Sequence, residues 1–445
     1  MRDRNGLVPA AGIALGAVLL FLTASLAANL VALRQGKLFP FSWFLFDPAD
    51  RFADFFKLSL SYPGPAVHAP AAWWHVDWLF ARYYRWLDVF ADSPFNNRHV
   101  PPFETMLALG QRALLTLADP MLVFSLLLAG SFALLCTATT RFVPATERAR
   151  MIFVTLLGYP ALFAMDRGHI YSVLCGALLI AAVARTLVRG EADRWSILLF
   201  AVALNFRPNA VLFPGALWLA GRMRFRELLF AGLGSVALLG LSFVVAHHFY
   251  PVYTPASLAK GLADYRAAYI GSANGLFYGS SLWGALLMFG VPDPLRTLLP
   301  LLVGGAITLV AALLARLEVV RASSFLFLVT SAYALSTTVF ADYHLVIFLL
   351  PLVFLVREES AGLPRRGEQL GVLVGSVAML LPKNFMFIPL GEERFLSTQV
   401  IINPLLLVQC ALLVMILAAG RLRREQLRDL VGSFRRPVAG ALQRA

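Results

Sequence analysis

The sequence predicts an all-α membrane protein whose chain crosses the bilayer many times. Hydrophobic residues make up 59% of the 445 residues and charged residues 14%, whereas about a quarter of a soluble domain is charged. The mean hydropathy is +0.73. Apolar runs near the length that crosses about 30 Å of hydrocarbon recur from Leu7 to Gly420. No soluble domain of ordinary size fits between these runs, so residues 1–445 are predicted to form a single integral membrane domain.

The distribution of basic residues predicts the orientation. The chain has 38 Lys and Arg against 25 Asp and Glu, a net charge of +13. In a soluble protein this excess would suggest a nucleic-acid partner. Here the clusters all fall on one side if every apolar run crosses, and positive loops are cytoplasmic. The clusters are Arg2/Arg4, Arg141/Arg148/Arg150, Arg185/Arg189/Arg194, Arg222/Arg224/Arg226, Arg316/Arg321, Arg357/Arg365/Arg366 and the basic tail at 421–445.

We therefore expect a multi-pass protein of the cell inner (plasma) membrane, with both termini in the cytoplasm and no nucleic-acid partner. Cys136, Cys175 and Cys410 lie inside apolar runs without metal-ligand spacing, so they are predicted to be packing residues without disulfides. No metal and no cofactor are expected.

The first apolar run, Leu7 to Leu33, is too long for the core of a cleavable signal and is expected to be a retained anchor. Residues 34–118 then form a first outer loop with two interfacial helices. The first, Ala71 to Phe90, places Trp and Tyr on one stripe opposite charged residues, which is typical of a helix in the membrane interface, although an ordinary soluble helix is the alternative. The second is a short apolar helix after Pro101-Pro102.

The later apolar runs alternate sides and bring the total to about twelve crossings. They are Met121 to Thr140, Met151 to Met165, Ile170 to Val188, Trp195 to Leu219, Leu228 to Phe249, Pro300 to Ala315, Ser323 to Val339, Leu345 to Val356, Leu370 to Leu381 and Val400 to Ala419. Arg207-Pro208 interrupts one of them, which predicts two shortened helices. A lipid-facing Arg at that depth costs several kcal/mol, so Arg207 is expected to face protein, water or a ligand.

Charged residues are predicted to converge on the outer face. They are the acids from Asp47 to Asp54, the turn Asp166-Arg-Gly-His169, Arg207, the segment Lys260 to Arg266, the turn Asp342-Tyr-His344, and Lys383. Basic groups there suit an anion such as a phosphate or pyrophosphate on a lipid, whose head group Arg207, Lys260 or Arg266 would neutralise. Arg167 and His169 share this face and complete the candidate substrate-binding residues.

The acids suit a second reactant. An ionised Asp can accept the proton of a hydroxyl as the oxygen attacks an anomeric carbon, while the cations stabilise the departing phosphate, which predicts single displacement with inversion. Each residue also has a structural explanation. Asp47, Asp50 and Asp54 could cap a short helix, His344 could be a packing residue, and Asp166 could simply pair with Arg167 at the turn.

The order of these features resembles the GT-C superfamily of membrane glycosyltransferases, and most closely glycosyltransferase family 87, the mannosyl- and arabinofuranosyltransferase-like proteins that use polyprenyl-phosphate sugars. The matching features, which span most of the chain, are Asp54-Phe55, the Pro101-Pro102 turn, the outer turn Asp166-Arg-Gly-His169, Arg207-Pro208 within an apolar run, and Ala341-Asp-Tyr-His344-Leu.

The resemblance implies a GT-C-like fold, a polyprenyl-phosphate-linked sugar donor and a lipid or glycan acceptor. It implies Asp54 as general base, with Asp50 as second candidate, and Arg207 and His344 on the donor-phosphate side. Two departures put the sugar and the acceptor in question. The outer turn reads Asp166-Arg-Gly-His169 where relatives more often have Gly and amide residues, and Arg207 stands where Lys is commoner.

The main alternative is a secondary transporter or lipid flippase, for which twelve spans are also a common plan. That class is expected to show internal repeats and a site near mid-membrane, whereas this sequence has no evident repeat and a large first outer loop suited to collecting lipid substrates. An acyl- or phosphate-transferring enzyme would need a buried His-Asp pair on one helix, which the sequence does not suggest. A glycosyltransferase active on the outer face, hexosyl- or pentosyl-transferring and mannosyltransferase-like, is the leading hypothesis.

Overall fold

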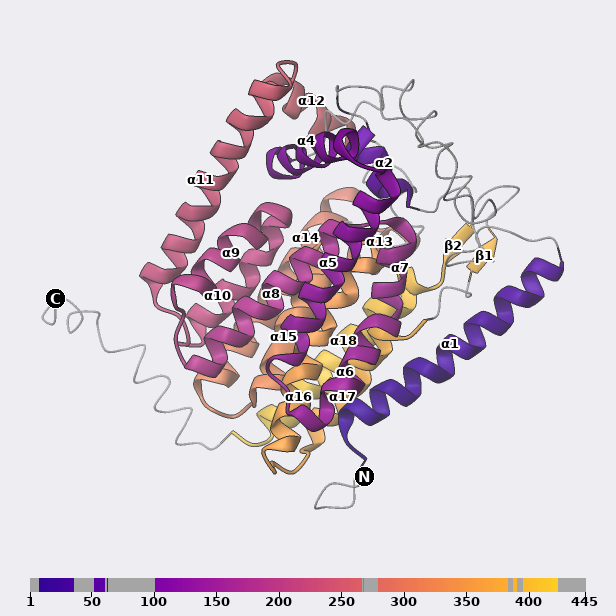
Figure 1. Cartoon of the computed structure of the whole chain (residues 1–445). Coiled ribbons are helices and arrows are strands. Elements are labelled where there is room, and N and C mark those ends of the chain that lie inside the picture. Colours follow the sequence, from indigo (N-terminus) through magenta and orange to yellow (C-terminus); the bar gives the residue numbers. More distant parts are fainter. Residues whose placement is uncertain are drawn as a thin grey trace, which may run out of the picture.

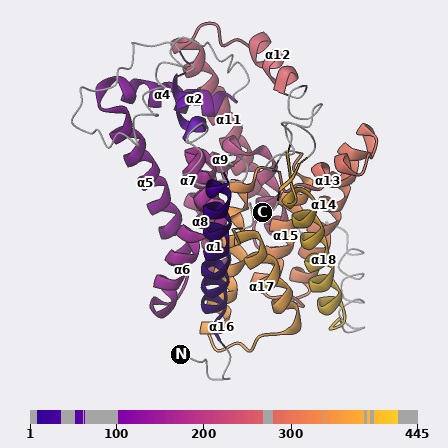
Figure 2. The ribbon, with the colours of Figure 1, turned by 90° about the vertical axis from the view of Figure 1, so that its right-hand side faces the viewer.

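The protein folds as a bundle of helices with one small hairpin (Figures 1 and 2). The structure is a computed structural model that describes residues 8–35, 52–60, 62, 101–265, 267, 279–338, 340–382, 387–389 and 395–422. The hairpin pairs β1 (Phe387–Pro389) with β2 (Phe395–Ser397) in antiparallel register, with Ile388 opposite Leu396.

Six helices in the described residues are long and apolar enough to cross a membrane. They are α1 (Ala10–Arg34), α5 (Pro120–Thr140), α8 (Ile170–Arg189), α11 (Phe225–Phe249), α14 (Asp293–Arg316) and α18 (Gln399–Ala419). A seventh span is possible if α6 (Ala145–Leu157) and α7 (Tyr159–Arg167), which meet at 48°, are counted as one. The expectation of a helical membrane protein is confirmed.

The remaining elements are shorter. Three of them are apolar helices of 10–17 residues, α9 (Arg194–Phe206), α15 (Ala322–Ser336) and α17 (Gly367–Leu380). The others are α2 (Ala53–Leu60), α4 (Pro102–Leu117), η1 (Pro208–Val211), α10 (Leu212–Leu219), α12 (Pro255–Tyr265), α13 (Leu282–Met288), η4 (Asp342–Phe348) and α16 (Leu349–Ser360).

Helices in the centre and at the rim of the bundle differ sharply in burial. Every residue of α15 from Ser323 to Ser336 is buried, and 72% of the apolar window of α8 is buried, against 11% for α11. A helix that is apolar on all sides has to lie in a protein core or in lipid. We therefore assign α8 and α15 to the core of the bundle and most of the α11 surface to lipid.

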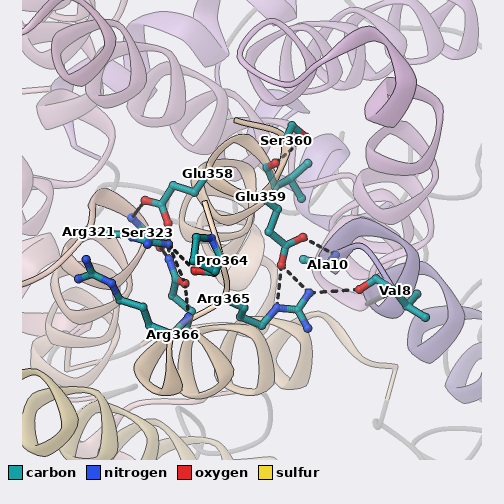
Figure 3. Close-up of polar contacts among 12 residues, drawn as sticks. Val8, Ala10, Arg321, Ser323, Glu358, Glu359, Ser360, Pro364, Arg365 and Arg366 are labelled. Atoms are coloured by element: carbon teal, nitrogen blue, oxygen red, sulfur yellow. Dashed lines mark hydrogen bonds and ion pairs between the residues drawn. The ribbon is translucent and has the colours of Figure 1, made fainter. Parts of the chain in front are cut away.

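The first and last described helices begin and end at the same end of the bundle. The backbone N–H of Ala10 donates to Glu359 Oε2 at 2.8 Å, and the Nε of Arg365 donates to Glu359 Oε1 at 2.7 Å (Figure 3). Arg421, just after α18, forms an ion pair with Glu368 at 2.5 Å. Glu359 and Glu368 flank the connection between α16 and α17, so both chain ends are tied to that connection.

The opposite end of the bundle carries the short helices. In both ribbon views α2, α4 and α12 lie at the upper end of the bundle, which the long helix α11 also reaches (Figures 1 and 2). Helix α4 lies where the second surface helix of the first outer loop was expected. The first, Ala71 to Phe90, lies outside the described residues, as do Asp50, Arg266 and Lys383.

Candidate functional site

Aromatic packing holds the short helix α2 against the turn between α7 and α8. Phe52 and Phe55 lie 4.4 and 4.8 Å, between ring centroids, from Phe124 of α5. The backbone N–H of Phe52 donates to the carbonyl of Asp166 at 2.7 Å. Gly168 has φ +68°, and a Cβ there would lie 3.0 Å from the Cβ of Phe55. A glycine is therefore required both by the left-handed turn and by the close approach of α2.

This packing brings Asp54 to Arg167. Asp54 lies in the first turn of α2, where a negative charge is favourable. Arg167 Nη2 donates to Asp54 Oδ1 at 2.9 Å and Arg167 Nε donates to Oδ2 at 3.2 Å. The side chain of Asp54 is 24% exposed and that of Arg167 is 18% exposed. This fork-shaped pair is a strong type of charged contact.

The next residue in the turn, His169, caps α8. Its Nδ1 accepts from the backbone N–H of Ser172 at 3.2 Å, so the proton of the neutral ring is on Nε2. Burial, together with the positive charges of Arg207 and Arg167, lowers the pKa of His169 to about 3. At neutral pH His169 is therefore an uncharged hydrogen-bond donor rather than a cation.

The 3₁₀ helix η4 closes the other side of His169. Tyr343 stacks on the His169 ring with 4.0 Å between centroids, and the His344 ring lies 6.0 Å from it, edge to face. The position of η4 is set by buried Asp342, whose carboxylate accepts from Tyr159 at 3.1 Å and from Ser280. The segment Asp342-Tyr-His344, expected to be a simple turn, thus forms a 3₁₀ helix that packs on His169. It is held there because the Asp342 carboxylate is hydrogen-bonded inside the bundle.

The break at Arg207 is present and reaches the same cluster. Helix α9 ends at Phe206, Arg207 is extended at φ −145° and ψ 99°, and Pro208 begins η1. An extended residue before proline is expected on steric grounds. Arg207 is partly buried, and its charge acts on His169 and on Glu104 of α4. Phe206 packs edge to face on Phe103, with 4.9 Å between centroids, which brings α4 to the break.

Glu104 is a site residue that sequence reasoning missed. Burial raises the pKa of its carboxyl, and the positive charge of Arg207 partly opposes this shift. The sequence places Glu104 directly after Pro101-Pro102 and ahead of an apolar helix, where it resembles an ordinary first-turn acid. The one sequence signal that could have identified Glu104 as a candidate is the scarcity of acidic residues in this chain.

Gln111 and Tyr171 were also missed. Gln111 Oε1 accepts from Ser59 and from Tyr171, both at 3.0 Å, and so joins α2, α4 and α8. These two side chains, Asp54 and His169 line a pocket of about 20 Å³. That volume accommodates a single water molecule.

The structure thus brings together Asp54, Arg167, His169, Arg207 and His344 at one end of the bundle. Lys260, another candidate from the sequence, is instead exposed and paired within its own helix. Its Nζ lies 2.7 Å from Asp264 Oδ2 of α12, and its side chain is 65% exposed. Asp50 and Arg266 lie outside the described residues. Within the described ranges no group of three or more His, Cys, Asp or Glu is placed to hold a metal ion.

Comparisons with models of protein families, with curated proteins and with solved structures find no match to this chain.

Proposed function

We propose that the protein is a membrane glycosyltransferase that moves a sugar from a polyprenyl-phosphate donor to a lipid or glycan acceptor. The observation that carries the proposal is the meeting of Asp54 and Arg167 with Arg207, His169 and His344 at one end of a membrane helix bundle. Carboxylates, guanidinium groups and imidazoles are costly near hydrocarbon and gather there mainly where charged ligands bind.

The proposal includes a GT-C-like fold with twelve crossings and the cluster on the outer face of the inner membrane. Its support is the helix order. Counting α6 with α7 as one span, η1 with α10 as one, and each of α1, α5, α8, α9, α11, α14, α15, α16, α17 and α18 as another makes twelve, with α9 and α10 as the two shortened helices on either side of Arg207. An even number of crossings agrees with the meeting of the first and last helices at the α16–α17 connection.

In the proposed reaction the acceptor hydroxyl donates its proton to the Asp54 carboxylate while the oxygen attacks the anomeric carbon of the donor. The bond from that carbon to the phosphate oxygen breaks, and the phosphate takes the bonding electrons. Arg207 stabilises this charge, and His169 Nε2–H offers a hydrogen bond that needs no charge on the ring. Attack opposite the leaving group inverts the anomeric configuration.

Substrate binding must also change the site. A pocket of about 20 Å³ accommodates no sugar. Helix α2 has only eight residues and is held by the packing of Phe52 and Phe55 on Phe124, by the Asp54–Arg167 pair and by the Ser59–Gln111 bond. We propose that donor binding shifts α2 and opens the space beside Asp54, as short elements at the edge of an active site commonly move to admit a substrate.

The test is transfer by the purified full chain in lipid vesicles, with radiolabelled polyprenyl-phosphate mannose and polyprenyl-phosphate arabinofuranose as donors. Asp54→Asn is expected to lower turnover by roughly 10²-fold to 10⁴-fold, the usual share of a general base, while donor affinity stays nearly unchanged. Asp293→Asn, at an exposed acid paired with Arg296, is the matched control and keeps full activity.

A second variant separates proton transfer from the ion pair. Arg167→Gln breaks the same contact but leaves the carboxylate, so it retains much more turnover than Asp54→Asn if Asp54 is the base. Equal losses in the two variants would reduce Asp54 to a structural partner of Arg167. Full activity of Asp54→Asn, or movement of labelled lipid across the vesicle without sugar transfer, would reject the proposal.

A further inference from the structure

The other end of the same helices holds a groove with basic side chains. A groove of about 660 Å³ runs between α5, α8 and α9, with Arg357 of α16 at its edge. Helix α8 links the two regions, because His169 caps its first residue and Arg189 is its last. Twenty residues of helix span about 30 Å, so the basic end of this groove, at Arg185 and Arg189, is separate from the cluster around Asp54.

The groove has two chemically different parts. Its walls are apolar, formed largely by leucines such as Leu134 and Leu178, and small residues at Ala177 and Ala181 of α8 leave the space open. Its mouth holds Arg141, Arg185, Arg189 and Arg357, beside Trp195, which is 50% exposed. Tryptophan at this position is typical of the level of lipid head groups.

The positive charge at the mouth is only partly neutralised. Asp193 accepts from Arg185 Nε at 2.8 Å and from Arg189 Nη1 at 2.6 Å, and it also caps α9 through the Ser196 N–H at 2.9 Å. Its oxygens are therefore already used. One aspartate against four lining arginines leaves a net charge of +3.

Arg141 and Arg357 carry most of that surplus. Both are exposed, and neither has an acidic partner within the described part of the chain. The one polar contact of Arg357 there is a weak bond of 3.5 Å to the carbonyl of Phe142. The neighbouring acids are engaged elsewhere, Glu147 with Arg150 and Glu358 with Ser323. Two guanidinium groups thus remain available at the end of an apolar groove.

We propose that this groove binds an anionic phospholipid of the surrounding bilayer. One acyl chain lies between α5 and α8, and the phosphate lies between Arg141 and Arg357. Basic pockets between membrane helices on the positively charged side favour such lipids, and guanidinium groups suit phosphate oxygens. A zwitterionic lipid fits the walls equally well but brings a cation to a mouth that is already positive.

The test is native mass spectrometry of the full chain in nonionic detergent, titrated with phosphatidylglycerol or phosphatidylcholine. We expect phosphatidylglycerol to bind at least tenfold more tightly. Arg141→Gln/Arg357→Gln should lower its affinity by roughly tenfold or more, because each surface arginine contributes about 1 kcal/mol near an anionic lipid. Arg222→Gln/Arg226→Gln removes two exposed arginines from the same end but outside the groove, and should change nothing.

A second measurement locates the acyl chain. Phosphatidylglycerol with dibrominated chains is expected to quench part of the tryptophan fluorescence, and Trp195→Phe should remove that part.

Equal affinity for the two lipids, equal losses in the two double variants, or no quenching assigned to Trp195 would overturn the proposal. Displacement by polyprenyl phosphate at a hundredfold lower concentration than by phosphatidylglycerol would assign the groove to a different lipid. Asp54→Asn leaves lipid binding unchanged, so failure here is distinguishable from failure of the proposed transferase activity.

Discussion

At the scale of single residues, Asp54 combines a local position with a long-range contact. It lies in the first turn of α2, as a helix-terminal acid would, and it also contacts Arg167 through both carboxylate oxygens. The residues of this pair are 113 positions apart. The sequence could therefore suggest each residue as functional, but not that they meet. The structural alternative for the turn, a local pair of Asp166 with Arg167, did not include this longer-range partner.

The role of Arg207 leads to a prediction about donor binding. Arg207→Ala removes the guanidinium group at the α9–η1 break. The affinity for a polyprenyl-phosphate sugar should fall by roughly tenfold to a hundredfold, because a hydrogen bond to a charged group contributes about 1.5–3 kcal/mol. Equilibrium binding of labelled donor to the detergent-purified chain measures this effect.

Arg207→Lys keeps the positive charge but loses the planar guanidinium group. Its affinity for the donor should therefore lie between those of the wild type and Arg207→Ala. Arg148→Ala, at an exposed position of α6, should bind donor as the wild type does. Unchanged donor affinity in Arg207→Ala would remove Arg207 from the phosphate site.

At the scale of elements, close helix packing explains how short helices are held in the bundle. Gly375 places α17 directly against α15 and α18, because a Cβ there would lie 2.6 Å from Phe327 Cε2 and 3.2 Å from Cys410 Cβ. Phe327 is fully buried and has no free space to move into. Small residues at such contacts let membrane helices approach closely.

Gly375→Ala should therefore destabilise the protein by about 1–3 kcal/mol through overpacking, in spite of the higher helix propensity of alanine. Thermal unfolding in detergent, followed by loss of soluble protein, should show a lower midpoint. Gly240→Ala is the matched control on α11, where an added Cβ meets nothing within 4 Å. Equal midpoints for both variants would mean that α17 can shift to accept the methyl group.

At the scale of the whole molecule, the contacts of Ala10 and Arg421 with the α16–α17 connection lead to a topology prediction. Fluorescent-protein fusions at either terminus should be fluorescent, because the positively charged side of the bundle is proposed to face the cytoplasm, where these proteins fluoresce. Alkaline phosphatase fused within the α11–α12 connection at 250–254 should be active, since that segment lies at the other end. Opposite results for the two terminal fusions would contradict an even number of crossings.

The charge balance of the whole site leads to a second prediction at this scale. Arg207 already supplies positive charge beside His169, where the donor phosphate is proposed to lie. Glycosyl transfer should therefore survive a strong chelator such as EDTA with less than about twofold loss. Activity that falls with the chelator and returns with a divalent ion would show that a metal, rather than the arginines, neutralises the leaving phosphate.

The sequence by itself determined the membrane character, the long helices, the basic end of the bundle and the break at Arg207-Pro208. These features depend on hydropathy, charge and the stereochemistry of proline, which act over one helix or less. Only the tertiary structure decided that Asp54 meets Arg167, that Glu104 lies within the field of Arg207, and that four arginines surround one groove. Such contacts join residues far apart in the chain, and they depend on side-chain packing that a local pattern does not encode.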